Sequence, residues 1–224
     1  MSEPAAASPV LLAVPGQGWW QARNSPARRV PSHGTDLFGS TFAIDLVGVD
    51  ERGRSGPIGW RTLLATEDPR LFVGFGRVVT APIAGLVEQV YEREPDGRVR
   101  RSPMAYPGFA ISQPRRIRRG IAGLAGNCVV IALGPSGPYV LVAHLQLGSV
   151  SVRPGERVEA GEPIGRCGNS GNSTQPHVHL QVNDSLHWST ARGLPLAFAD
   201  FQDRDGTVTR TGVPAEAQVV RRAV

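Results

Sequence analysis

The chain has 224 residues, 41% of them hydrophobic and 19% charged, with 27 glycines, 19 prolines and a formal net charge of +5. At this length a single core buries roughly 70% of the unfolded surface, so no disulfide framework is needed for folding, and the many chain breakers exclude an architecture of long helices. All 24 basic residues are arginine, which excludes P-loop lysines, Schiff-base lysines and Ser-Lys catalytic pairs.

Short runs of β-branched and apolar residues between evenly spread breakers predict an all-β fold. We expect antiparallel sheets that form a β-sandwich or barrel-sandwich hybrid core, with long loops and little helix. In chain order, the predicted strands are 42–49, 76–81, 85–93, 127–133, 139–144, 157–160, 163–167 and 177–183. Turn sequences at 95–97 and 134–137 are expected to link several strands as hairpins. Only 60–65 favours a helix.

Two stretches, 50–75 and 98–120, lack sustained alternation and are predicted to be insertions. The second contains seven arginines and three prolines, so it is either an exposed charged face or a contact for an anionic polymer. No aromatic residues alternate with these arginines, so no nucleic-acid partner is expected. The predicted organisation is an N-terminal extension (1–29), a β domain (30–190) and a C-terminal extension (191–224); the pattern does not indicate the oligomeric state.

The N-terminal segment has an apolar stretch over 9–15, but it carries Glu3 and no preceding arginine. It therefore differs from a secretory signal, and no run reaches the roughly 18 apolar residues of a membrane span. As the sequence stands, we expect a cytoplasmic protein without a membrane span. Cys128 and Cys167 form neither a disulfide framework nor a CxxC pair, and we expect two half-buried thiols.

The five histidines include a His-x-His pair, His177 and His179. In a strand, residues i and i+2 point to the same face, so these two imidazoles project together while Val178, Leu180 and Val182 face the core. Two imidazoles on one face are a natural part of a metal site, although a lone pair is weak evidence. The segment 168–174 before it is expected to be a tight turn and not a phosphate loop.

Further polar residues stand in or near apolar strands. His144 ends an alternating strand, where Val140, Val142 and His144 are expected to share a face. Asp45 lies inside the apolar strand 42–49, where an unpaired carboxylate would be costly and a bound metal would account for it. His33 and Asp36 precede this strand, and His187 is expected to be a surface histidine.

These motifs together resemble the lysostaphin/LytM-type zinc metallopeptidases, which are peptidoglycan endopeptidases. The shared pattern is an early His and Asp, a central His-Leu and a late His-x-His, carried here by His33, Asp45, His144-Leu145 and His177-Val178-His179. The segments 81–87, 126–131 and 152–174 also resemble the family. The resemblance covers about residues 30–183.

The resemblance implies a zinc ion held by His33, Asp45 and His179, with His144 and His177 as catalytic residues. It implies hydrolysis of the peptide crosslinks of peptidoglycan by a zinc-activated water, and hence an extracytoplasmic location if this substrate holds. The family spacing is His-x-x-x-Asp, whereas eleven residues separate His33 from Asp45 here, so Asp36 remains an alternative ligand. Asp45 is preferred because family members with a longer spacer have a similar aromatic-Ala-apolar-Asp strand.

Two other functions stay open. One is a catalytically inactive binding or regulatory module on the same scaffold that activates other cell-wall hydrolases. The other is a phosphocarrier of the sugar phosphotransferase type, which uses paired histidines without a metal. The ligand set looks complete, which favours the peptidase over a module that has lost ligands, and a phosphocarrier would leave His33 and Asp45 unexplained.

Overall fold

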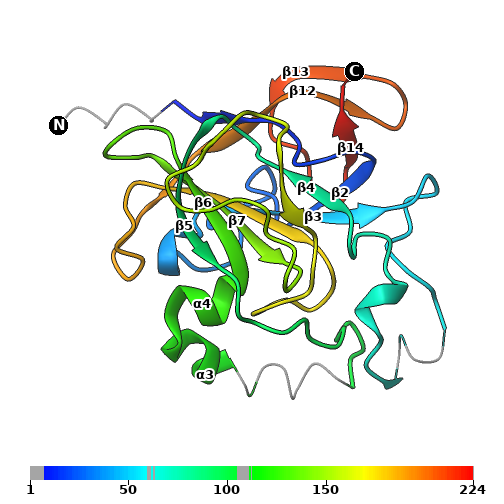
Figure 1. The fold of residues 1–224 in the computed structure, drawn as a ribbon. Helices are drawn as coiled ribbons and strands as arrows, with labels where there is room; N and C mark the ends of the chain where they lie inside the picture. The colour runs from blue at the N-terminus through cyan, green and yellow to red at the C-terminus, as the bar shows by residue number, and fades with distance from the viewer. Residues whose placement is uncertain (1–7, 60–61, 63, 105–110, 112, 224) are drawn as a thin grey trace.

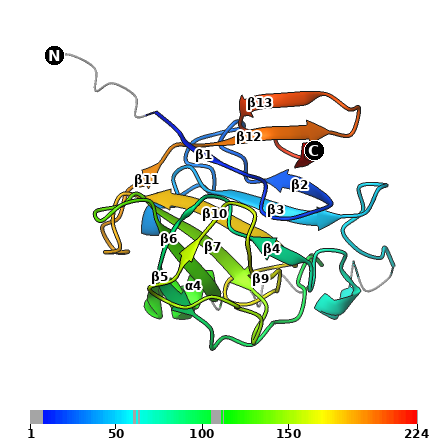
Figure 2. The same cartoon turned by 45° about the horizontal axis from the view of Figure 1, so that its top comes forward.

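The computed structural model describes residues 8–59, 62, 64–104, 111 and 113–223. Strands dominate it, and two short helices, α3 (Gln113–Arg118) and α4 (Gly120–Ala125), lie side by side at one end of the molecule (Figures 1 and 2). The predicted all-β fold with little helix is confirmed. Within the described ranges, no helix has the length and apolar character needed to cross a bilayer.

Most strands belong to one large curled sheet. Its strands are β1 (Val10–Leu12), β2 (Trp19–Arg23), β3 (Ile44–Val49), β5 (Gly85–Tyr91), β6 (Asn127–Ala132), β7 (Tyr139–Leu145), β8 (Arg157–Val158), β10 (Val178–Asn183), β11 (Gly193–Leu194), β12 (Leu196–Asp203), β13 (Val208–Gly212) and β14 (Val219–Arg222). The order is β1-β12-β14-β2-β3-β10-β7-β6-β5-β8, with β11 beside β10 and β13 beside β12. A separate pair joins β4 (Val78–Thr80) to β9 (Pro163–Arg166). Among the described strands, only the pair β1–β12 is parallel.

The eight predicted strands are present as β3 to β10, with ends that differ by no more than two residues. The turn at 134–137 links β6 to β7, as predicted. The segment 95–97 does not close a hairpin: the carboxylate of Asp96 instead accepts hydrogen bonds from the backbone N–H groups of Leu147 (3.1 Å) and Asn169 (2.6 Å). The predicted helix over 60–65 includes residues 60, 61 and 63, which lie outside the described residues.

The two predicted extensions contribute strands to the same large sheet. β1 and β2 come from the N-terminal segment, and β11 to β14 come from the C-terminal segment (Figure 2). Their buried side chains Trp20 and Phe198 belong to the same core cluster as Leu46 and Leu180 of the central strands. The terminal segments therefore pack as part of the fold, while the domain boundaries remain a prediction.

The stretch 98–120, predicted as a loop, contains helix α3, and α4 follows it directly. This region contains a helical repeat that its many arginines obscure in the sequence. The apolar residues of the repeat, Ile117, Ile121, Leu124 and Ala125, are spaced i, i+4, i+7 and i+8. Gly120, with φ +63°, interrupts the helix between the first two. Ile121 and Ala125 pack on the outer face of β6 and β7, so α4 covers that face of the sheet (Figure 1).

Candidate metal centre

The strand register places Asp45 in the middle of a row of side chains. Asp45 on β3 pairs with His179 on β10, and on its other side with Arg23 on β2. Directly paired residues project from the same face of a sheet, with Cβ atoms about 5 Å apart. Three strands that are distant in sequence thereby present one cation, one carboxylate and one imidazole side by side.

His33 completes a three-residue cluster from the loop before the 3-10 helix η1 (Leu37–Gly39). Its Nδ1 lies 3.0 Å from Ser32 Oγ, and its Nε2 lies 3.2 Å from Asp45 Oδ2. His179 Nδ1 lies 2.8 Å from Asp45 Oδ1. One potential ligand atom from each of these three residues lies within 4.8 Å of the other two.

Two imidazole nitrogens and one carboxylate oxygen fit a catalytic zinc ion, which takes three protein ligands and keeps an open position. The cluster contains all three residues that the resemblance implied, His33, Asp45 and His179. Asp36 is not part of it and is exposed to solvent. The geometry therefore favours Asp45 over Asp36, and the role of the three residues as ligands remains a prediction.

Two amide side chains orient the cluster, and sequence reasoning missed both. Gln181 Oε1 lies 2.8 Å from His179 Nε2, and Asn24 Nδ2 donates to Asp45 Oδ2 over 2.7 Å. Such outer partners fix the rotamer and basicity of metal ligands. Gln181 continues the i, i+2 face of the His-x-His pair and was detectable in the sequence. Asn24 directly follows β2, and no sequence signal connects it to Asp45.

Asp45 is only 8% exposed. Burial by itself raises its pKa, but the charges of His33 and His177 and hydrogen bonds from His177 and His179 hold this pKa well below its usual value. Asp45 is therefore ionised at neutral pH, which is the state that a metal ion requires.

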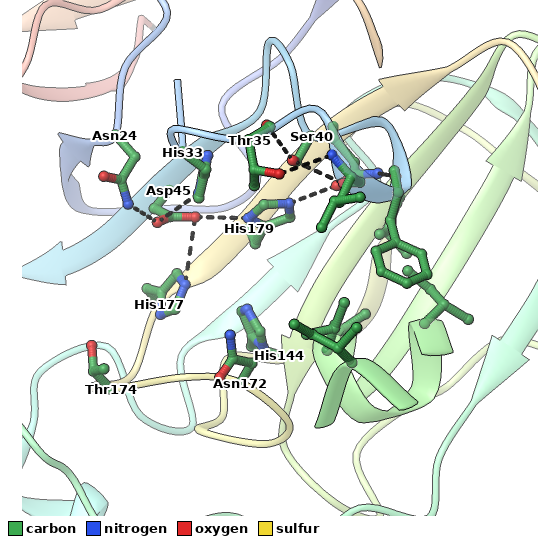
Figure 3. A pocket seen from close by; sticks show the side chains of 18 residues that line it. Asn24, His33, Thr35, Ser40, Asp45, His144, Asn172, Thr174, His177 and His179 are labelled. Carbon is green, nitrogen blue, oxygen red and sulfur yellow. Dashed lines mark hydrogen bonds and ion pairs between the residues drawn. The ribbon is translucent and has the colours of Figure 1, made fainter. Parts of the chain in front are cut away.

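His144 and His177 form a second imidazole pair beside the cluster, with ring centroids 4.5 Å apart (Figure 3). His144 Nδ1 hydrogen-bonds to the carbonyl of Ser170 (2.9 Å), and His177 Nδ1 to the carbonyl of Gln175 (2.8 Å). A carbonyl only accepts, so each Nδ1 carries the proton. His177 Nε2 lies 3.5 Å from Asp45 Oδ1.

The two imidazoles differ in proton affinity. Burial, together with the charges of His177 and His179, lowers the pKa of His144 well below its usual value. Burial also lowers the pKa of His177, but the neighbouring Asp45 outweighs it, and the pKa is raised overall. Neighbouring groups whose pKa values are pushed apart suit different acid-base roles.

A β-bulge turns His144 toward this site. Regular alternation would place His144 with Val140 and Val142, as the sequence predicted, and that prediction is wrong. Val140, Val142 and Leu145 lie in the main core, whereas Leu141 and His144 line the site. His144 has φ +62°, and the β6–β7 register shifts at this point. A bulge adds one residue to a strand and thereby redirects a side chain.

The cluster opens into a pocket of about 410 Å³ that we call the site pocket (Figure 3). Its polar side contains His33, Asp45, His144, His177 and His179. The pocket is also lined by apolar side chains, Leu37, Ile117, Ile121, Leu124 and Leu141. The helices α3 and α4, which the sequence did not reveal, therefore contribute apolar side chains to the pocket of the candidate metal centre.

The remaining predicted residues lie outside this centre. His187 is exposed, as expected, and is not part of the cluster. Cys128 and Cys167 are free and fully buried, which is deeper than predicted. Burial raises the pKa of each thiol to about 12, so both stay protonated and unreactive at neutral pH.

An all-β fold that gathers these histidines and Asp45 around one pocket is the arrangement that the resemblance to lysostaphin-type metallopeptidases implied. Residues 110–190 match the sequence profile of Peptidase family M23, and the predicted resemblance is confirmed. The chain is 38% identical over 58 residues to the peptidoglycan DD-endopeptidase ShyA of Vibrio cholerae, covering 26% of this chain and 13% of the relative. It is 32% identical over 109 residues to lysostaphin of Staphylococcus simulans. This match covers 47% of this chain and 22% of the relative.

The matched regions thus span less than a quarter of the length of these curated relatives. Among solved structures, the lysostaphin catalytic domain of Staphylococcus simulans aligns with a TM-score of 0.38 and 18% identity, covering 71% of this chain and 80% of that one. The metalloprotease pseudoalterin aligns with a TM-score of 0.43 and 12% identity, and the alignment covers 85% of this chain and 76% of pseudoalterin.

Proposed function

We propose that the protein is a zinc-dependent endopeptidase that hydrolyses short peptide crosslinks of peptidoglycan. The observation that carries the proposal is the joint presence of the His33–Asp45–His179 cluster and the His144–His177 pair in one pocket. A module that had lost its catalytic function would be expected to lack part of this set, so the activating, inactive module is the less favoured alternative. The related enzymes named above support the substrate class.

In this proposal, His33, Asp45 and His179 hold the zinc ion. When bound, zinc supplies a Lewis acid that lowers the pKa of water and polarises the peptide carbonyl. Asp45 contributes the anionic ligand, and its ionised state follows from its imidazole neighbours.

In this proposal, His144 accepts a proton and His177 donates one. His144 is neutral, and its Nδ1–H is held by Ser170 O, so its Nε2 is the acceptor for a proton from the attacking water. His177 has the raised pKa and donates from Nε2 to the oxyanion or the leaving amine. Positioned acid-base groups of this kind contribute about 10²- to 10⁴-fold in rate.

Metal analysis and hydrolysis together test the proposal. We expect one zinc per chain in the wild type, a loss of zinc in His179→Ala, and retained zinc with at least about 100-fold slower hydrolysis of purified peptidoglycan in His144→Ala. His187→Ala, an exposed histidine outside the pocket, is the matched control and should resemble the wild type. Absence of stoichiometric zinc from the wild type, or equal zinc in His179→Ala, would contradict the metallopeptidase mechanism.

The same experiment separates the enzyme from the regulatory alternative. A wild-type protein that binds peptidoglycan and accelerates another hydrolase, but releases no peptide by itself, would support the inactive module. The extracytoplasmic location that the substrate requires is tested by fractionating cells that carry the full-length protein.

A further inference from the structure

We propose that a second pocket, on the other side of Asp45 and His177, binds a carboxylate of the substrate peptide through Arg23 and Arg28. This inference rests on the proposed endopeptidase function and adds a specificity determinant to it. The pocket, called the cationic pocket here, has a volume of about 440 Å³ and is lined by Arg23, Arg28 and Glu216 together with Asp45 and His177.

The sheet register fixes the position of Arg23 relative to the candidate metal centre. Arg23 is the direct strand partner of Asp45, so both side chains leave the same face of the sheet at neighbouring positions. Its side chain is 48% exposed and therefore accessible to a ligand that lies over Asp45. Arg23 thus lines the same pocket as Asp45 of the proposed reaction centre.

Arg28 is held nearby by a turn that the C-terminal segment secures. Its backbone N–H donates to Ser25 O over 3.0 Å. Ser25 is fully buried, and its hydroxyl donates to Pro214 O (2.5 Å) while its N–H donates to Glu216 Oε2 (3.0 Å). The backbone from which Arg28 projects is therefore anchored, although its side chain remains 57% exposed.

The two guanidinium groups of the cationic pocket have hydrogen-bonding capacity left for a ligand. Arg23 Nη1 and Arg28 Nη1 each lie 4.0 Å from Glu216 Oε1, which is beyond hydrogen-bond length. Glu216 Oε2 is already engaged by the N–H of Ser25. The second carboxylate of the pocket, Asp45, is already bonded to Asn24 and to His179. Within the described part of the chain, neither guanidinium group makes a hydrogen bond to either carboxylate. Their free N–H groups can receive a further carboxylate, which guanidinium groups bind with two parallel hydrogen bonds.

The two pockets differ in chemistry and meet at Asp45 and His177. The site pocket has an apolar wall that includes Ile121 and Leu141, whereas the cationic pocket contains the two arginines. Asn24 and Thr174, which line both pockets, lie on the side of the cluster away from helix α4 (Figure 3). A peptide that crosses the centre would place an apolar group toward α4 and a carboxylate toward Arg23 and Arg28.

The test uses two synthetic crosslink peptides of identical sequence. One carries a free carboxylate on the residue next to the scissile bond, and the other carries the carboxamide. Wild-type protein should cleave the carboxylate peptide with a kcat/KM about tenfold higher, which corresponds to about 1.4 kcal/mol. Arg23→Gln/Arg28→Gln should lose this preference by slowing only the carboxylate peptide, with unchanged zinc content. Arg210→Gln, an exposed arginine paired with Asp200 on another strand, should behave as the wild type.

Glu216→Gln is expected to increase the preference for the carboxylate peptide, a result that a folding defect would not produce. It removes the competing negative charge but keeps an oxygen that accepts from Ser25 N–H, so the preference for the carboxylate peptide should rise severalfold. Equal kcat/KM of the wild type for both peptides, or an unchanged ratio in the double arginine variant, would overturn the carboxylate site.

Calorimetric binding of the same two peptides separates this inference from the proposed function. Tighter binding of the carboxylate peptide without cleavage of either would support the cationic pocket and contradict the endopeptidase. Equal binding of both peptides by the wild type would overturn the cationic pocket whether or not cleavage occurs.

Discussion

Asn24→Gly is expected to weaken zinc binding by the protein about 10- to 100-fold. Asn24 donates an amide hydrogen bond of 2.7 Å to Asp45 Oδ2, in a site where Asp45 is only 8% exposed. The loss of an outer partner of a metal ligand typically lowers metal affinity by this factor. The tenfold limit corresponds to about 1.4 kcal/mol and the hundredfold limit to about 2.8 kcal/mol.

Glycine is the informative replacement because Asn24 has φ +49°. Glycine adopts this left-handed conformation without steric cost, so the variant removes the amide and leaves the backbone unstrained. Asn24→Ala removes the same amide but adds about 1 kcal/mol of backbone strain. Both variants should therefore lose the same zinc affinity and the same hydrogen bond to Asp45, and Asn24→Ala should be about 1 kcal/mol less stable than Asn24→Gly.

The assay is competition for zinc between the metal-free protein and a chromophoric chelator at pH 7, with urea unfolding of the same samples. Gln21→Ala is the matched control, because Gln21 lies on β2 three residues before Asn24 and its side chain donates to Ala217 O instead of Asp45. A zinc Kd for Asn24→Gly within twofold of the wild-type value, in a protein that still unfolds cooperatively in urea, would refute the positioning role of Asn24.

Three further predictions concern stability. Trp20→Ala should cost about 3–5 kcal/mol in urea unfolding, because Trp20 is fully buried in the main core; a loss below 1 kcal/mol would mean that the N-terminal segment is a separate extension. Ser170→Ala should cost about 1–3 kcal/mol, because the buried Ser170 Oγ accepts from Asn127 N and donates to Leu145 O; a neutral effect would contradict this role. Cys128 and Cys167 have pKa values raised from 9.0 to about 12, so the folded state holds these protons more tightly. Their contribution to stability is complete below pH 9 and is lost as the pH rises toward 12, by about 1.4 kcal/mol per pH unit for each thiol. Urea titrations should show a shallower alkaline loss in Cys128→Ala/Cys167→Ala than in the wild type, and parallel pH profiles would contradict the raised pKa values.

The central strands were predictable because their periodicity is local. The His177–Val178–His179 segment alternates with period two, and the structure follows it: Val178 is buried while both imidazoles approach Asp45. The strand that carries Asp45 was evident from its apolar neighbours. Resemblance to lysostaphin-type peptidases then linked His33 to this carboxylate, although the spacing in this chain is longer than usual.

Other features depended on contacts between distant segments. Nothing in the alternation of 139–145 indicates the bulge at His144, because the bulge arises from how β7 pairs with β6. The apolar stripe from Ile117 to Ala125 is hidden among arginines, and it becomes helical where it can pack on β6 and β7. β2 was missed because Gly and Pro surround its five residues, yet it pairs fully with β3.

The sequence by itself determined the all-β class, the central strands and the residue types of the candidate centre, because each depends on short-range periodicity or on a motif. The sequence left Asp36 open as an alternative to Asp45, and the tertiary structure places Asp45 with His33 and His179 while Asp36 remains in solvent. The tertiary structure also decided that Asn24 and Arg23 border this carboxylate. Strand pairing between segments far apart in the chain creates these neighbours, and no local pattern encodes that register.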